Sequence, residues 1–462
     1  MKLIVGEYTS AQAERLGING EGIATIDRMV IFIPNLLPGE KAKVEITRVE
    51  RNYAEARVIK RDNDSPERVT PPCPIYDECG GCQIQHMSPR LQMDYKEEIV
   101  RNAFRQKTKL NVDKADIRGT KGMDNPWYYR NKSQFPLSTR RGEIVSGLYK
   151  PNTNELVPIE HCMVQQRDTT NINNAIVRIL NELDIPVYDA RRDVGFARTV
   201  IVRSGYKTDD VQVVLVVGNE DVPRLDELSD RIMALPNVVS FHLNINSNRS
   251  GVIFGYRTVH IAGQDKMDEQ LDDVHYHLSP RAFFQLNPAQ TEVMYREVVE
   301  AAGLTGEERV IDAYAGVGSI GLWLAPHAKE IRGMEVVPEA VEDANAHMRE
   351  NGFNHAMYVE GRAEHWIPRW VKDGWIPDVI VVDPPRTGVD HQLLNAMISS
   401  KAKRIVYVSC NPQTLARDAD QLMKADYKIN YIQPYDMFPQ TAHVRVNRRL
   451  REEEKEKVLT GL

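Results

Sequence analysis

The sequence lacks any apolar run long enough to cross a membrane, and residues 1–7 contain no apolar core of signal-peptide length. We therefore expect a cytoplasmic protein with no membrane partner. An excess of positive charge is also missing, because 65 acidic residues outnumber 59 lysines and arginines and give a formal net charge of -6. Global electrostatics therefore do not predict nucleic-acid binding, and any basic surface must be local.

Cysteine is scarce, with five among 462 residues, and the odd number argues against a disulfide framework in a large cytoplasmic chain. Four cysteines lie in the first half and one stands alone in the last third. They are Cys73, Cys79, Cys82, Cys162 and Cys410. This division predicts a metal site and a separate reactive thiol. The chain length predicts several domains.

Residues 1–62 read as short strands separated by turn signals such as Gly17–Gly22 and Pro38–Gly39. Several short strands in so few residues predict a small OB-like β-barrel. Such barrels often bind oligonucleotides, although the same pattern also fits a domain with no RNA role.

Three of the cysteines follow one another closely at positions 73, 79 and 82, with glycines at 80 and 81 that allow a tight backbone. Cys162 is the only other cysteine nearby in sequence. Four thiolates can bind either zinc or a 4Fe–4S cluster, and the spacing does not decide between them. The other interpretation is a set of unliganded thiols.

The middle of the chain, residues 63–282, has the mixed pattern of an α+β domain. Ser88 and Pro89 are the cap and first turn of a helix predicted over 88–109. Residues 118–150 carry a local excess of positive charge with interleaved aromatics, which suits phosphates and unstacked bases. A solvated charged face is the other interpretation.

From residue 309 onward, strands and helices alternate at βαβ spacing. The strand Arg309–Asp312 runs into a glycine turn at 313–321, and Glu335 ends the next strand. An acid at the second strand end can accept hydrogen bonds from both ribose hydroxyls of a nucleoside. No third glycine completes the dinucleotide pattern, so the turn favours S-adenosylmethionine (SAM) over a nicotinamide cofactor.

Two further strand ends carry chemistry. Asp383–Arg386 follows one strand, and the apolar run Ile405–Val408 leads directly to Cys410. Asp-Pro-Pro before an aromatic is typical of methyltransferases that modify amino groups, but here Arg386 follows. Amino-group methylation needs no thiol, whereas methylation of an unactivated pyrimidine carbon does. A purely structural cysteine is the alternative.

These motifs together resemble the RNA uracil-C5 methyltransferases. The residues that carry the resemblance are Phe283–Asn287, Asp312–Gly318, Asp383–Arg386 and Ser409–Pro412. The four other cysteines resemble those of the 4Fe–4S subset that acts on ribosomal RNA, and the opening barrel resembles the TRAM domain. The resemblance covers about residues 1–444 and is greatest to bacterial 23S rRNA (uracil-C5)-methyltransferases of Gram-positive type.

The resemblance implies three domains followed by a charged tail. They are a TRAM RNA-binding barrel at 1–62, a central iron–sulfur and RNA-binding domain at 63–282, a Rossmann-like SAM-dependent domain at 283–444, and a tail at 445–462. It also implies that the helix at 88–109 packs on the catalytic domain. The implied partner is 23S rRNA, with no obligate protein partner.

The resemblance further implies SAM and a 4Fe–4S cluster as cofactors, with Cys410 as the nucleophile. The implied cluster ligands are Cys73, Cys79, Cys82 and Cys162. The implied SAM contacts are Gln285, Tyr314, Ser319, Glu335, Arg362 and Asp383. The Cys410 thiolate would attack C6 of uracil, C5 would take the methyl group, and a base would then remove the C5 proton.

The chain departs from the family pattern at Arg445, because the family places its general-base glutamate directly after a His-Val pair such as His443-Val444. The family also expects a final apolar strand, whereas residues 445–457 are charged and read as helical or disordered. We therefore hypothesise that methyl transfer occurs, that proton removal is impaired, and that a covalent RNA adduct accumulates.

Two alternatives stay open at this point. One is a transfer-RNA uracil-C5 methyltransferase, and the other is a non-catalytic RNA-binding or RNA-folding protein. The complete cofactor motifs disfavour an iron–sulfur electron-transfer protein.

Overall fold

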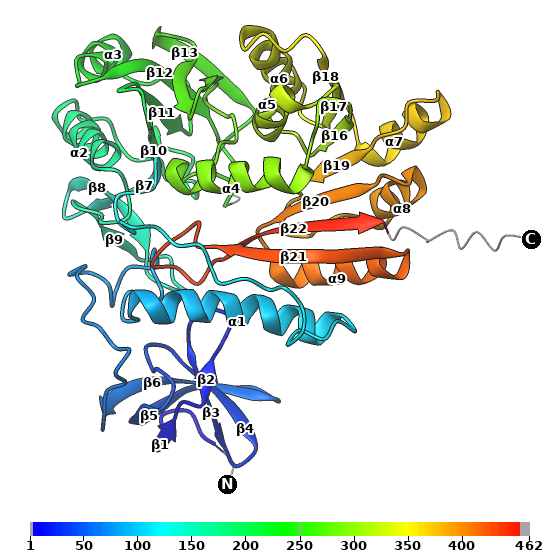
Figure 1. The fold of residues 1–462 in the computed structure, drawn as a ribbon. Helices are drawn as coiled ribbons and strands as arrows, with labels where there is room; N and C mark the ends of the chain where they lie inside the picture. The colour runs from blue at the N-terminus through cyan, green and yellow to red at the C-terminus, as the bar shows by residue number, and fades with distance from the viewer. Residues whose placement is uncertain (1–2, 249–250, 453–462) are drawn as a thin grey trace, which may run out of the picture.

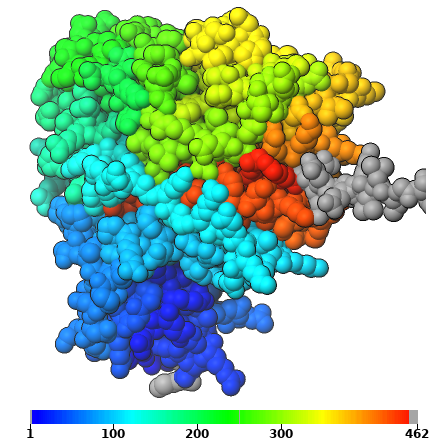
Figure 2. Space-filling view, in the orientation of Figure 1, coloured from blue at the N-terminus to red at the C-terminus, as the bar shows by residue number. Residues whose placement is uncertain are grey.

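The computed structural model describes residues 3–248 and 251–452. A small β-domain forms one end of the molecule, a long helix lies against it, and two larger sheet-based units lie beyond that helix (Figure 1). On the face seen in Figure 2, residues around 90–130 cover the surface between the β-domain and the rest of the molecule. Among the described residues, no helix combines the length and apolar character that a bilayer crossing requires.

The N-terminal β-domain is one six-stranded sheet with the order β1-β5-β6-β4-β3-β2. Alternating apolar residues of its strands, among them Ile31, Val44 and Ile46, are fully buried in a core of their own. The strands are β1 (Tyr8–Gln12), β2 (Arg15–Leu16), β3 (Gly22–Ile26), β4 (Met29–Ile33), β5 (Lys41–Val49) and β6 (Tyr53–Arg61).

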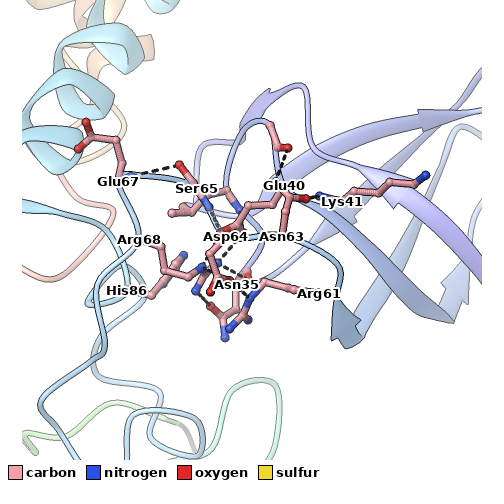
Figure 3. Close-up of polar contacts among 12 residues, drawn as sticks. Asn35, Glu40, Lys41, Arg61, Asn63, Asp64, Ser65, Glu67, Arg68 and His86 are labelled. Atoms are coloured by element: carbon pink, nitrogen blue, oxygen red, sulfur yellow. Dashed lines mark hydrogen bonds and ion pairs between the residues drawn. The ribbon is translucent and has the colours of Figure 1, made fainter.

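A buried ion pair joins this domain to the segment that follows it. Arg68 donates from Nε and Nη2 to the two carboxylate oxygens of Glu40 at 2.6 and 2.7 Å, and from Nη1 to Asn35 at 2.9 Å. Glu40 is fully buried and also accepts from the backbone of Leu37 and Ser65. Figure 3 shows Arg68 reaching into this group of residues. A bidentate pair of this kind fixes the direction in which the chain leaves the β-domain.

The central unit is a seven-stranded sheet with the order β13-β12-β11-β10-β7-β8-β9, and its helices pack on one face. Only β11 and β12 are parallel. Its elements are β7 (Lys132–Arg140), β8 (Glu143–Tyr149), β9 (Leu156–Pro158), α2 (Arg167–Glu182), β10 (Ala197–Ser204), β11 (Val211–Val217), α3 (Leu225–Met233), β12 (Val238–Ile245) and β13 (Arg257–Gly263). The hairpin of β14 (Met267–Leu271) and β15 (Val274–Leu278) follows.

The C-terminal unit is a second seven-stranded sheet with the order β18-β17-β16-β19-β20-β22-β21. The first five strands are parallel. From β16 the chain first adds β17 and β18 on one side, and then crosses to the other side of β16 to add β19 and β20. This doubly wound arrangement confirms the predicted Rossmann-like domain, and folds of this kind bind ligands at the carboxyl edge of the strands.

The elements of this unit run in order along the chain. They are α4 (Pro288–Ala302), β16 (Arg309–Ala313), α5 (Ser319–Leu324), η1 (Ala325–His327), β17 (Glu330–Glu335), α6 (Pro338–Glu350), β18 (Ala356–Glu360), α7 (Ala363–Lys372), β19 (Val379–Val382), α8 (His391–Ser400), β20 (Arg404–Ser409), α9 (Pro412–Lys424), β21 (Tyr427–Tyr435) and β22 (Arg445–Glu452).

Helix α1 (Pro89–Lys107) belongs to this C-terminal unit in space although it precedes the central one in sequence. Ser88 caps the helix by accepting from the Leu91 amide at 3.1 Å. Val100 and Phe104 enter the same core as the strands of the second sheet. Lys96 and Asp436 form an ion pair, and both side chains are almost fully buried. The pair fixes α1 to the segment after β21.

Strand β22 overturns one expectation from the sequence. Residues 445–452 are neither helical nor disordered, because they form a strand that pairs antiparallel with β20 on one side and β21 on the other. Ladder hydrogen bonds on both sides, and the burial of Val446 and Leu450, outweigh the charged composition. Residues 453–462 of the predicted tail lie outside the described residues.

Candidate functional site

Cys410 lies between the end of β20 and the start of α9, at the carboxyl edge of the second sheet. Its side chain is partly exposed and forms no disulfide. The neighbouring Asn411 caps α9 by accepting from the Gln413 amide at 3.1 Å, and Pro412 fits the first turn. The strand, the cap and the helix together fix the backbone on both sides of the thiol.

The loop after the adjacent strand β19 is tied to the same place. The side-chain amide of Asn411 donates to the Arg386 carbonyl at 2.9 Å, and the Thr414 hydroxyl donates to the same oxygen at 3.4 Å. Asp383 begins this loop directly after β19. The Cys410 turn and the Asp383 loop therefore form one rigid edge.

The glycine turn after β16 is held open by left-handed backbone. Tyr314, Gly316 and Gly318 have φ of 60°, 55° and 76°, and a Cβ on Gly316 would meet nothing within 4 Å. The Gly316 amide donates to one carboxylate oxygen of Glu335 at 3.0 Å, and the Val336 amide donates to the other at 2.7 Å. This open turn with an acid at the neighbouring strand end fits a nucleoside.

The buried Asp312, near the end of β16, bonds to Gly321 just after this turn and to Tyr358 in β18. One carboxylate oxygen of Asp312 accepts from the Tyr358 hydroxyl and from the Gly321 amide, each at 3.1 Å. A Cβ on Gly321 would lie 1.8 Å from that hydroxyl, so only glycine fits there. Burial raises the pKa of Asp312 to about 7.

Gln285, Asp383 and Arg445 meet at the same edge. Arg445 donates from Nη1 to the side-chain oxygen of Gln285 at 2.7 Å, and its Nη2 pairs with Asp383. The Gln285 amide lies 3.5 Å from Asp383. Burial raises the pKa of Asp383, and Arg445 opposes that shift. We use the name glycine-turn crevice for the carboxyl edge of β16, β17 and β19, where Gln285, Asp312, Glu335 and Asp383 lie.

Two further residues that the resemblance assigned to SAM lie at the starts of helices α5 and α7. Ser319 is the first residue of α5, directly after the glycine turn. Arg362 occupies the N-cap position of α7 without a side-chain capping bond, pairs with Glu364 at 3.6 Å, and has a side chain that is 67% exposed.

The other four cysteines border a separate cavity of about 540 Å³. The cysteines that line it are Cys73, Cys79, Cys82 and Cys162, and all four are free thiols. The same cavity extends to Arg386, Thr441 and His443, so it reaches from the cysteines to the loops around Cys410. Within residues 3–248 and 251–452, no three or more His, Cys, Asp and Glu side chains are arranged to hold a metal ion.

Sequence reasoning missed two features of the site. It assigned no role to the Asn411 side chain, although an asparagine before a helix-starting proline is a capping signal. It also treated Arg445 only as a missing base. No local sequence pattern predicts that Arg445 contacts Gln285 and Asp383, because the partners are 160 and 62 residues away in the sequence.

Comparison with known sequences identifies related proteins along nearly the whole chain. A family model described as tRNA (Uracil-5-)-methyltransferase matches residues 369–452, and one described as TRAM domain matches residues 2–59. An uncharacterized RNA methyltransferase of Bacillus anthracis is 47% identical over 444 residues, which is 96% of each chain. One of Halalkalibacterium halodurans is 49% identical over 440 residues, 95% of each chain.

A solved structure shows the same fold. The Pyrococcus abyssi tRNA (uracil-54, C5)-methyltransferase, crystallised with S-adenosyl-L-homocysteine (SAH), has a TM-score of 0.75 and is 26% identical to this chain. The similarity covers 96% of this chain and 99% of that one. The family match through residue 452 also includes β22, so the chain does not leave the family pattern as a whole at residue 445.

Proposed function

The chain belongs to the RNA uracil-C5 methyltransferase family, and from this premise we propose that it transfers a methyl group from SAM to C5 of a uridine in 23S rRNA. The observation that carries the proposal is the position of Cys410. The thiol lies at the carboxyl edge of the sheet, beside the Asp383 loop to which Asn411 is bonded. A cytoplasmic location remains a prediction.

The glycine-turn crevice fits the cofactor. The residues proposed to hold it are Gln285, Tyr314, Ser319, Glu335, Arg362 and Asp383. The open backbone at Gly316 and the carboxylate of Glu335 beside it support this assignment. SAM supplies an electrophilic methyl group when bound.

Cys410 supplies the activation that C5 of uracil needs before it can accept a methyl group. Attack of the thiolate on C6 forms a carbon–sulfur bond and moves the electron pair of the C5–C6 double bond onto C5, which can then take the methyl group. Loss of the C5 proton and β-elimination of the thiol would regenerate the double bond. The target uridine must leave its stack for this chemistry.

The second half of this cycle needs a base, and the position where the family has its glutamate is an arginine. Arg445 follows His443-Val444, and a guanidinium remains protonated and accepts no proton. It is 5% exposed and engaged with Gln285 and Asp383. We propose that the Cys410 adduct forms and that its release is slow.

The four remaining thiols suit a 4Fe–4S cluster held by Cys73, Cys79, Cys82 and Cys162. They line one cavity, and all-cysteine ligation is the usual donor set for such a cluster. Zinc is the alternative, because four thiolates also suit a structural zinc ion. We propose a structural role for the cluster. Iron, sulfide and zinc analysis of anaerobically purified protein tests the assignment, and stoichiometric zinc without sulfide would refute it.

Transfer RNA is the second candidate substrate. It is favoured by the description of the matching family model and by the similar P. abyssi enzyme. Incubation with labelled SAM and either 23S rRNA fragments or tRNA separates the two, because methyl incorporation or adduct formation will occur mainly with one RNA. Mapping of 5-methyluridine in rRNA from cells with and without the protein identifies the modified position.

A non-catalytic RNA-binding role is the remaining candidate, and the arginine at the expected base position is what favours it. Replacement of Cys410 by alanine in cells separates this role from catalysis. An unchanged phenotype and an unchanged 5-methyluridine content would favour binding alone.

A further inference from the structure

The glycine-turn crevice contains an internal cation. Asp312, Glu335 and Asp383 are close enough to interact electrostatically at the carboxyl edge of β16, β17 and β19. Arg445 enters the crevice from the first position of β22. Its guanidinium therefore lies beside Gln285 and Asp383, two of the residues proposed to hold the cofactor.

The guanidinium is held firmly. Arg445 is 5% exposed, bonds to Gln285 at 2.7 Å, and pairs with Asp383, whose side chain is 13% exposed. The side-chain oxygen of Gln285 and one carboxylate oxygen of Asp383 are thus already occupied by a cation. The remaining donor, Nε of Arg445, is buried without a hydrogen-bond partner among the described residues.

We propose that Arg445 makes this crevice select the neutral thioether SAH over the sulfonium cation SAM. The inference rests on the proposed function, which puts the cofactor beside Gln285 and Asp383. SAM and SAH share their adenosine, amino and carboxylate groups, so the contributions of those groups to binding cancel in the ratio of the two dissociation constants. The methylated sulfur alone carries the extra positive charge, and a cofactor held beside Gln285 and Asp383 would bring that charge near the Arg445 guanidinium.

The size of the effect follows from the burial of the pair. Two like unit charges a few ångströms apart repel strongly at the dielectric typical of protein sites. Repulsion between the Arg445 guanidinium and the sulfonium should therefore weaken SAM binding roughly tenfold to hundredfold. Burial of Arg445 limits the screening of this repulsion by salt. Tight binding of the demethylated product would also retain SAH after one methyl transfer, which adds to slow turnover.

Strand β22 provides a matched control. Arg451 is the same residue type on the same strand, but it is exposed and lies at the opposite end, opposite Arg404 and Lys428. Arg451→Met removes one arginine from β22 without touching the crevice. Arg445→Met removes the internal cation with a side chain of similar length.

Isothermal titration calorimetry of the full chain with SAM, SAH and adenosine tests the inference. We expect the ratio Kd(SAM)/Kd(SAH) to fall about tenfold or more in Arg445→Met and to be unchanged in Arg451→Met. Adenosine affinity should agree within about twofold in all three proteins. An unchanged ratio in folded Arg445→Met overturns the inference, whereas absence of SAM and SAH binding to every folded protein overturns the proposed function instead.

Three further variants keep the test decisive if Arg445→Met does not fold. Arg445→Lys retains the positive charge and should keep the wild-type ratio, whereas Arg445→Gln is neutral and should lower it. Asp383→Asn leaves the cation without its counter-charge and should raise the ratio further. Equal ratios in the wild type, Arg445→Gln and Asp383→Asn contradict the proposal.

Discussion

The side-chain oxygen of Gln285 accepts a hydrogen bond of 2.7 Å from Arg445, a residue 160 positions later in the chain. This contact joins the segment before α4 to the first residue of the last strand. It also orients the amide of Gln285, whose nitrogen then lies 3.5 Å from Asp383. The identity of residue 445 therefore determines the charge that the glycine-turn crevice presents beside Cys410.

Arg445→Glu should restore turnover. The β22 ladder is formed by backbone groups and does not depend on this side chain. A second carboxylate beside the buried Asp383 would raise the pKa of one member of the acid pair, which suits a base working near neutral pH. We expect at least about a tenfold rise in free methylated RNA per enzyme under multiple-turnover conditions. Arg451→Glu is the exposed control, and equal product from both variants would refute the assignment.

Removing Lys96 should destabilise the fold strongly. Lys96→Met leaves Asp436 buried without its ion-pair partner, which costs about 3–5 kcal/mol in proteins with comparable pairs. Urea unfolding at neutral pH measures the loss, and adding Asp436→Leu to Lys96→Met should recover most of it. Arg90→Met is the control, because Arg90 and its partner Asp94 are largely exposed. A similar small effect from Lys96→Met and Arg90→Met would contradict the account of α1 docking.

Replacing Arg448 should stabilise the protein. Arg448 is fully buried beside the Phe104 ring, and none of its three guanidinium nitrogens has a hydrogen-bond partner in the part of the chain that the structure describes. Burial lowers the pKa of this group to about 9. Arg448→Leu removes the desolvated charge, and we expect a gain of about 1–4 kcal/mol in the free energy of unfolding. Arg451→Leu should change it by less than about 0.5 kcal/mol; a loss of stability in Arg448→Leu would show that the cation has an essential partner.

Asp312 should make stability depend on pH. Its pKa of about 7 in the folded protein lies above the value of about 3.9 for an unfolded chain. Folding therefore favours the protonated form of Asp312. Its contribution to the free energy of unfolding is fully present below about pH 4 and is lost as pH rises through about 7. Relative to wild type, Asp312→Asn should gain up to about 4 kcal/mol between pH 4 and pH 8. Urea unfolding across this range measures the gap, and a constant gap would contradict the raised pKa; exposed Asp230→Asn is the control.

Local sequence patterns were sufficient for the parts of the fold that are built locally. Alternating apolar residues and paired turn signals predicted a small domain of short strands at 1–62, which the resemblance identified as a TRAM domain, and the strand, glycine turn and acid at 309–335 predicted the Rossmann-like domain. Both are confirmed. The thiol at the end of β20 was likewise visible as an apolar run that stops at Cys410.

Contacts between distant segments could not be predicted in this way. The charged composition of residues 445–452 indicated no strand, because the slot between β20 and β21 exists only in the folded sheet. The contact of Arg445 with Asp383 depends on where β22 enters that slot. The bond from Asn411 to Arg386 similarly requires two strand ends to lie side by side.

The most direct test of the central claim is the covalent state of Cys410 after reaction. Wild-type protein, methyl-labelled SAM and a uridine-containing 23S rRNA fragment are incubated together, and the products are separated on a denaturing gel. We predict that labelled RNA migrates with the protein, that the label approaches one methyl group per chain, and that Cys410→Ala abolishes the adduct. Free 5-methyluridine RNA produced over many turnovers, with no protein-linked label, would contradict the account.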